Sequence, residues 1–245
     1  MKKIILILML IVGLTGCANT GPMKPEQKAG IHNVAIVSLL GDQLEFTKVG
    51  FTVFNNDYFV RDTSSWELDT KTQKAIANEL QKSSPDIKVV EVPFNRAQLF
   101  KIYKSPDSWG DYASVDRIEA ELKSKLSETP VDAIILVYKQ SAQDPVAFTS
   151  VHVRGFGIFY RTLPFVDSLM KPYAIFSIEI LDGKTLKPIA RKYTVTVSKQ
   201  FGKTQISWDD QLKNNLSEAM LKDFQSDLDS MITDNIKSSL KELGL

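Results

Sequence analysis

Two short, largely apolar runs most constrain what this chain can fold into. Residues Val34–Leu40 (VAIVSLL) and Ala133–Tyr138 (AIILVY) are rich in branched apolar side chains and carry no charge. Runs of this length and composition are typical of strands that are covered on both faces. We therefore predict an α/β (α+β) fold in which these strands form the parallel centre of a mixed sheet, with helices on both faces.

Further elements are predicted between these two runs. Apolar residues alternate over Leu44–Phe54, which favours a second strand, and Ile87–Val92 (IKVVEV) favours another. Ser64 and Glu67 have the spacing of a capping box, which predicts a helix from there to about Gln81. Two shorter helices are expected over residues 96–103 and over residues 115–129, where Pro130 ends the second.

The second half of the chain has an alternating pattern. Over Tyr173–Leu181, apolar residues fall on one strand face, namely Ala174, Phe176, Ile178 and Ile180. Asp182 and Gly183 then give a turn signal, and Ile189–Val197 alternates again. These residues predict an antiparallel hairpin at the edge of the sheet.

A long helix is predicted at the C-terminus. Ser207 and Asp210 form a second capping box, and apolar residues then recur every three or four positions as far as Leu240. A continuous helix would be about 50 Å long, more than one small domain can cover. Either the helix breaks between Asp227 and Asp234 and covers its own sheet, or its end packs on something else.

The N-terminus predicts export. Lys2 and Lys3 precede the uncharged run Ile4–Val12, which is too short to span a bilayer and has the length of a secretory signal. The following Leu14–Cys17 resembles the bacterial lipobox. That resemblance implies that residues 1–16 are a cleaved signal peptide and that Cys17 carries diacylglycerol and an N-acyl chain such as palmitate. Several acyl chains would give a durable membrane anchor.

The residues after Cys17 suggest a location. Residues 17–30 are polar and contain several Gly and Pro residues, so we expect a flexible lipidated tether followed by a single domain over residues 31–245. Ala18 in place of aspartate resembles lipoproteins sorted to the outer membrane. This implies an outer-membrane protein facing the periplasm, or a cell-membrane protein if the organism has one membrane.

Composition and motifs exclude several functions. Removing Lys2 and Lys3 changes the formal charge from +1 to −1, so nothing suggests nucleic-acid binding. Acylation uses the single cysteine, and neither histidine has a metal-ligand partner at a recognisable spacing. Apart from the lipid on Cys17, we expect no cofactor and no metal. Because no catalytic motif is present, we expect a protein that is not an enzyme.

The most unusual stretch is Arg154–Lys171 (RGFGIFYRTLPFVDSLMK), which mixes aromatic and basic residues. Protein interfaces are enriched in these residue types. The candidate partner-binding residues are Arg154, Phe156, Phe159, Tyr160, Arg161 and Phe165. The alternative is a strand and its connecting loop folded into the core, with the arginines flanking it.

The order NVAIVSLLG, capped helix, IKVVEV, further helix, VDAIILVYKQ resembles the α/β domains of periplasmic lipoproteins of the curli-secretion and peptidoglycan-synthase-activator types. The resemblance covers about half of the chain and carries over no functional residue. The leading hypothesis is a membrane-anchored binding or assembly module of the cell envelope with an envelope protein as partner. The alternatives are an envelope hydrolase that uses a carboxylate pair and a small-molecule carrier.

Overall fold

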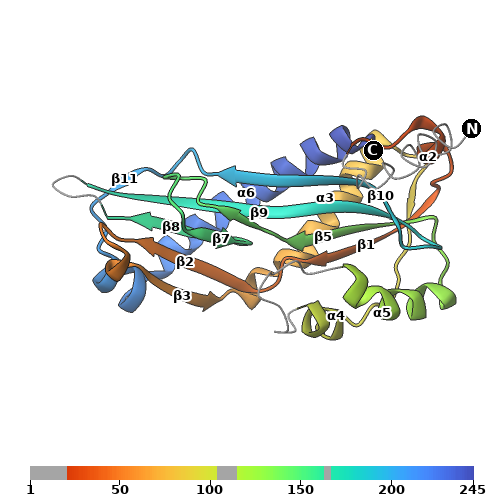
Figure 1. Cartoon of the computed structure of the whole chain (residues 1–245). Coiled ribbons are helices and arrows are strands. Elements are labelled where there is room, and N and C mark those ends of the chain that lie inside the picture. The colour runs from red at the N-terminus through yellow and green to blue at the C-terminus, as the bar shows by residue number, and fades with distance from the viewer. Residues whose placement is uncertain (1–20, 104–114, 163–166) are drawn as a thin grey trace, which may run out of the picture.

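One long strand organises the fold in the computed structural model, which describes residues 21–103, 115–162 and 167–245. This strand, β9 (Ser168–Asp182), has 15 residues and runs along the main sheet (Figure 1). One edge of β9 pairs antiparallel with β8 (Phe156–Arg161) and then with β5 (Ala133–Lys139). Its other edge pairs antiparallel with β10 (Pro188–Val197) and β11 (Lys203–Thr204).

The parallel pairs lie outside β9. Strand β1 (Asn33–Leu39) is parallel to β5 on one side and to the short β4 (Lys88–Val89) on the other. Strand β2 (Gln43–Val49) is parallel to β8, and β3 (Asp57–Asp62) pairs antiparallel with β2 at the outer edge. The predictions of a mixed sheet and of an antiparallel β9–β10 hairpin are therefore confirmed. The predicted parallel centre is wrong, because the central strand β9 is antiparallel to both β5 and β8.

Helices cover both faces of the sheet, as predicted. Helices α3 (Leu68–Ser83) and α6 (Glu218–Leu243) pack on one face, against the apolar side of β9 formed by Ala174, Phe176, Ile178 and Ile180. Helices α4 (Arg96–Tyr103) and α5 (Val115–Glu128) cover part of the other face. A hairpin of β6 (Ser141–Gln143) and β7 (His152–Arg154) packs over another part of that face.

Three predicted boundaries are wrong. The strand predicted over Leu44–Phe54 ends at Val49, and a 3₁₀ turn, η2 (Val53–Asn55), follows. The strand predicted over Ile87–Val92 is limited to β4. The Ser64–Glu67 capping box does not form, because residues 64–66 form a 3₁₀ turn, η3 (Ser64–Trp66), and Glu67 has a φ of 49°.

The C-terminal helix is long, but its break lies earlier than predicted. Ser207 caps a seven-residue π-helical turn, η4 (Trp208–Asn214), by accepting a hydrogen bond from the Asp210 amide at 3.2 Å. Ser217 then caps α6, which continues for 26 residues without a break. The sheet can cover α6 because β9 is about 50 Å long at 3.3 Å per residue, and α6 is about 39 Å long.

The described part of the segment expected to be a tether packs on the domain. It contains a short helix, α2 (Pro25–Ala29), and the buried side chain of Met23. The Met23 amide donates to the Leu243 carbonyl at 3.1 Å, so this segment lies beside the C-terminal end of α6. Cys17 lies outside the described residues. Over the part of the chain that the structure describes, no helix is long and apolar enough to cross a membrane.

Candidate functional site

The structure places most of the predicted partner-binding residues on β8 or beside it. Three aromatic rings are buried, with exposed fractions of 1% for Phe156, 0% for Phe159 and 5% for Tyr160. They are buried because β8 lies between β2 and β9 and is covered on both faces. We therefore correct the expectation that these rings form an exposed surface, since the stretch is a core strand.

The remaining predicted residues flank this strand. Arg154 ends β7 and Arg161 ends β8, and both side chains are half-buried. Arg161 donates to the Ala147 carbonyl at 3.2 Å, which ties β8 to the loop after β6. Phe165 lies outside the described residues.

Large apolar side chains are exposed instead on the loop between β2 and β3. We call this loop, residues 50–56, the distal tip. The exposed fractions of its large apolar side chains are 74% for Phe51, 76% for Val53 and 93% for Phe54. The distal tip lies at the opposite end of the molecule from α2 and the C-terminus (Figure 1). An exposed apolar cluster of this kind is typical of an interaction site.

Internal hydrogen bonds fix the conformation of the distal tip. The Asn55 amide donates to the Thr52 carbonyl at 3.0 Å, and the Thr52 hydroxyl donates to the Asn55 side-chain carbonyl at 2.7 Å. The Gly50 amide donates to the Asn56 side chain at 3.0 Å. A Cβ atom at Gly50 would lie 2.3 Å from the Asn55 Cβ, so the close turn requires glycine here.

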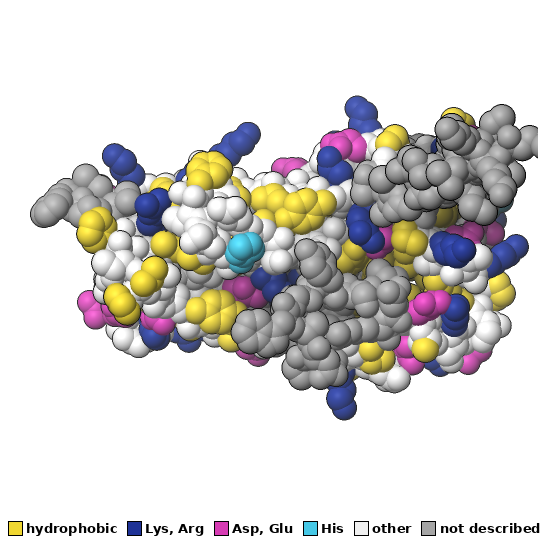
Figure 2. All heavy atoms as spheres, viewed as in Figure 1, with side chains coloured by type: hydrophobic (Ala, Val, Ile, Leu, Met, Phe, Trp, Pro, Cys, Tyr) yellow, Lys and Arg dark blue, Asp and Glu magenta, His cyan; other side chains and the backbone are white. Residues whose placement is uncertain are grey.

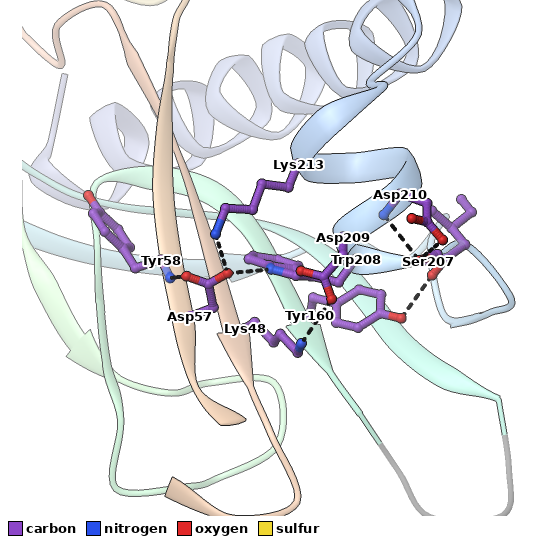
Figure 3. Close-up of polar contacts among 10 residues, drawn as sticks. Lys48, Asp57, Tyr58, Tyr160, Ser207, Trp208, Asp209, Asp210 and Lys213 are labelled. Carbon is purple, nitrogen blue, oxygen red and sulfur yellow. Dashed lines mark hydrogen bonds and ion pairs between the residues drawn. The ribbon is translucent and has the colours of Figure 1, made fainter. Parts of the chain in front are cut away.

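Asp57 joins the base of the distal tip to η4 (Figure 3). Its carboxylate accepts hydrogen bonds from the Trp208 indole at 2.9 Å, from the Lys213 ammonium at 2.7 Å and from the Tyr58 amide at 2.8 Å. The hydrogen bonds from Lys213 and Trp208 lower the pKa of Asp57 to about 2. The carboxylate is therefore ionised at neutral pH.

Aromatic packing strengthens the same base. Phe59 stacks on Phe46 with a centroid distance of 4.5 Å and meets the Trp208 ring edge-on at 5.2 Å. The Tyr160 ring lies 5.4 Å from the Trp208 ring, and its hydroxyl donates to the Ile206 carbonyl at 2.8 Å. Edge and offset contacts between rings are favourable geometries. The base is therefore an ordered aromatic layer under a loop that exposes apolar side chains.

The charges around the distal tip are balanced. The sequence of residues 50–56 (GFTVFNN) contains no charged residue. Beneath it Lys213 pairs with Asp57, and the Lys48 ammonium lies 3.9 Å from the Asp209 carboxylate. On the face shown in Figure 2, basic and acidic side chains both occur near the hydrophobic side chains at this end. The distal tip itself is therefore uncharged, and its most exposed large side chains are apolar.

A buried carboxylate lies where β1 passes into β2. Asp69 on α3 accepts hydrogen bonds from the Ser38 hydroxyl at 2.5 Å and from the amides of Leu40 and Gly41 at 2.7 and 3.0 Å, and it pairs with Arg96. Burial raises its pKa despite these contacts. Through these bonds Asp69 holds α3 against the end of β1 and against the first residue of α4.

Among the described residues, the two aspartates with raised pKa do not face one another. Burial raises the pKa of Asp227 on α6, which interacts with Ser198, whereas Asp69 accepts hydrogen bonds from Ser38, Leu40 and Gly41. Among the described residues, no group of three or more His, Cys, Asp or Glu side chains could hold a metal ion. The distal tip is therefore the best-supported candidate site.

The sequence contained a partial signal for this site. Phe51 and Val53 fit the alternation of a strand, so the pattern extended β2 beyond its true end. Gly50 and the pair Asn55 and Asn56 are turn formers, and together they could have placed a loop over residues 50–56.

Comparisons with known proteins place the chain in no family. No protein-family model matches it, and no curated protein matches it. Several solved structures show partial similarity. A Xanthomonas campestris protein described as DUF330 has a TM-score of 0.42 and 8% identity over 92% of this chain and 93% of its own.

Two further matching structures have lower TM-scores. A lipoprotein from Neisseria meningitidis has a TM-score of 0.32 and 11% identity, over 82% of this chain and 98% of its own. A hypothetical protein from Chlamydia trachomatis has a TM-score of 0.32 and 10% identity, over 85% of this chain and 99% of its own. Similarity at this level implies no shared function.

Proposed function

We propose that this chain is a lipid-anchored bacterial lipoprotein that serves as a binding or assembly module of the cell envelope through its distal tip. The observation that carries the proposal is the exposure of Phe51, Val53 and Phe54 on an ordered loop. The anchor is supported by the signal sequence and by the lipobox residues that end at Cys17.

The order of the loop favours binding. A partner that covers Phe51, Val53 and Phe54 would remove apolar surface from water, which is favourable. Because hydrogen bonds and Asp57 already hold the loop, little conformational entropy would be lost on association. We propose that the partner is an envelope protein with an uncharged apolar recess, into which the two phenylalanine rings insert as anchors.

The position of the loop suits an anchored protein. The chain enters the domain at α2, and the distal tip lies at the far end of the sheet (Figure 1). With Cys17 held in the outer membrane on its periplasmic side, or in the cell membrane of a single-membrane organism, the tip would point away from the membrane. The partner would then be met at a distance from the anchoring bilayer.

In-cell crosslinking of the tagged, lipidated full-length protein tests this proposal. The double variant Phe51→Ser with Phe54→Ser is expected to lose a discrete heavy adduct that the unchanged protein forms. Val195→Ser is the matched control, because Val195 is a 39% exposed apolar residue on β10, outside the tip. An adduct that persists in the double variant at equal protein levels would contradict the proposal.

We also propose that the protein has no catalytic role. A hydrolase of the carboxylate-pair type needs two acids that face one another across a cleft. Asp69 and Asp227 instead contact different parts of the fold. Release of soluble fragments from purified peptidoglycan by the isolated protein would contradict this part of the proposal.

A further inference from the structure

A groove runs along the outer edge of β1, away from the distal tip. Its volume is about 590 Å³. Its walls are residues 36–38 of β1, residues 70–77 of α3 and residues 89–94, which comprise the end of β4 and the segment after it, and Arg96 of α4 also lines it. Most of the wall formed by residues 89–94 is apolar, with Val90, Val92 and Phe94 half-buried.

The β1 edge is left without a neighbouring strand in this groove. Strand β4 pairs with β1 only at Asn33 and Val34, and the last backbone bond is donated by the Val90 amide to the Val34 carbonyl at 2.8 Å. Successive residues of a strand direct their backbone groups to opposite edges. Ile36 and Ser38 therefore direct theirs to the same edge as Val34.

These backbone groups have few partners. The Ile36 carbonyl accepts a hydrogen bond from the Gln73 side chain at 3.3 Å. Strand β4 supplies no paired neighbour to Ile36 and Ser38, because its pairing with β1 ends at Val34. Backbone amides at the wall of a groove pair with protein groups, with water or with a bound ligand, so the Ile36 and Ser38 amides can donate to a chain that enters this groove.

The spacing of these groups matches a peptide backbone. Alternate residues of a strand lie about 7 Å apart, and an extended peptide presents its carbonyl groups toward one edge at the same interval. Two basic side chains and one acidic side chain line the groove. Lys74 is exposed and forms no ion pair with another described residue, whereas Arg96 pairs with Asp69. Glu91 is exposed on the wall formed by residues 89–94.

We propose that this groove binds an extended peptide segment of a partner protein, which adds to β1 as a strand beyond β4. The segment carries alternating apolar side chains, which pack on Val90, Val92 and Phe94, and an acidic side chain that faces Lys74. Strand addition to an open sheet edge is a recurrent mode of peptide recognition. This site uses no residue of the distal tip, so the two proposals stand independently.

Selection from a phage-displayed library of random decapeptides tests the groove. The immobilised full-length protein is expected to enrich peptides that alternate apolar residues and contain an acidic residue. In hydrogen exchange followed by NMR, an enriched peptide should slow exchange of the Ile36 and Ser38 amides and leave that of the Phe51 and Phe54 amides unchanged.

Substitutions sharpen the test. Lys74→Glu should weaken binding of the enriched peptide about five- to tenfold, the scale of one exposed ion pair turned repulsive. Lys82→Glu, on the same helix but outside the groove, should leave affinity unchanged. Ile36→Pro removes the outward amide while the bonds to β5 remain, so it should abolish binding.

The proposal is overturned by any of three results. These are the absence of an enriched peptide, protection of tip or β10 amides in place of Ile36 and Ser38, and equal affinity for the Lys74→Glu and Lys82→Glu variants. Circular dichroism of each variant shows whether it is folded. If Ile36→Pro is unfolded, the Lys74→Glu comparison and the exchange data decide.

Discussion

At the scale of single residues, two aspartates hold segments that are distant in the sequence. Asp57 connects the β2–β3 loop to η4, and Asp69 connects α3 to the bend between β1 and β2. They differ in their surroundings. Asp57 is partly exposed and has a lowered pKa, whereas Asp69 is buried and has a raised pKa. Replacing each of the two aspartates should therefore lower the free energy of unfolding by a different amount.

Asp57→Asn should lower the free energy of unfolding by about 1 kcal/mol at pH 7, since the pair with Lys213 is partly exposed to solvent. The pKa of Asp57 is lowered from 3.8 to about 2, so its ionised form stabilises the fold above pH 4. This stabilisation should disappear as pH falls from about 4 to about 2. Urea unfolding of the unchanged protein and of Asp57→Asn at pH 7 and pH 2.5 measures this stabilisation. Asp209→Asn is the control, and it should change the free energy of unfolding very little.

Asp69→Ala should lower the free energy of unfolding by about 3 kcal/mol, because it leaves the buried amides of Leu40 and Gly41 without an acceptor. Asp223→Ala, at an exposed position on α6, should change it by less than about 0.5 kcal/mol. Urea unfolding of both variants at pH 7 measures the difference. Equal stabilities would show that Asp69 does not connect these elements.

At the scale of elements, the distal tip depends on a glycine at one position. Gly50→Ala would place a Cβ 2.3 Å from the Asn55 Cβ and 2.7 Å from the Asn55 carbonyl carbon, so the loop must shift. Gly202→Ala is a matched control, because a Cβ there has no atom within 4 Å. We expect Gly50→Ala, and not Gly202→Ala, to lower the melting temperature and to weaken the crosslinked adduct. Equal adduct yields would mean that the loop conformation is unimportant for binding.

At the scale of the whole molecule, β9 makes one cooperative unit of an elongated sheet. The first residues of β9 pair with β8 and β11, and its last residues pair with β5. Both ends of the sheet therefore share the strand β9. Helix α6 adds to this continuity, because its core residues extend from Phe224 to Leu243 along the same face. The two ends of the molecule should therefore unfold together.

Unfolding of the full-length protein should be a single transition. Far-UV circular dichroism and tryptophan fluorescence, which includes Trp208 at the tip end, should give the same midpoint in urea. Phe224→Ala should lower the free energy of unfolding by about 3–5 kcal/mol, because Phe224 is fully buried between the rings of Phe46 and Phe201. Two separate midpoints in the unchanged protein would contradict a single cooperative unit.

Local patterns in the sequence were enough to predict most elements. The buried strands over residues 34–39 and 133–138, helix 96–103 and the inner face of β9 were predicted correctly. These features depend on periodicity and composition within a dozen residues, which the chain displays directly. The Ser207 cap was also predicted, since a cap depends on neighbouring residues.

The positions of the surfaces depended on contacts that local patterns do not contain. Phe156 and Phe51 are both phenylalanines in alternating stretches, yet one is buried and the other 74% exposed. The difference arises because β8 received neighbours on both edges and both faces, whereas residues 50–56 extend beyond the end of the sheet. The sequence by itself thus determined most of the elements, and it carries the predicted export signal. Only the tertiary structure decided which apolar residues are exposed, because that depends on which distant segments pack against them.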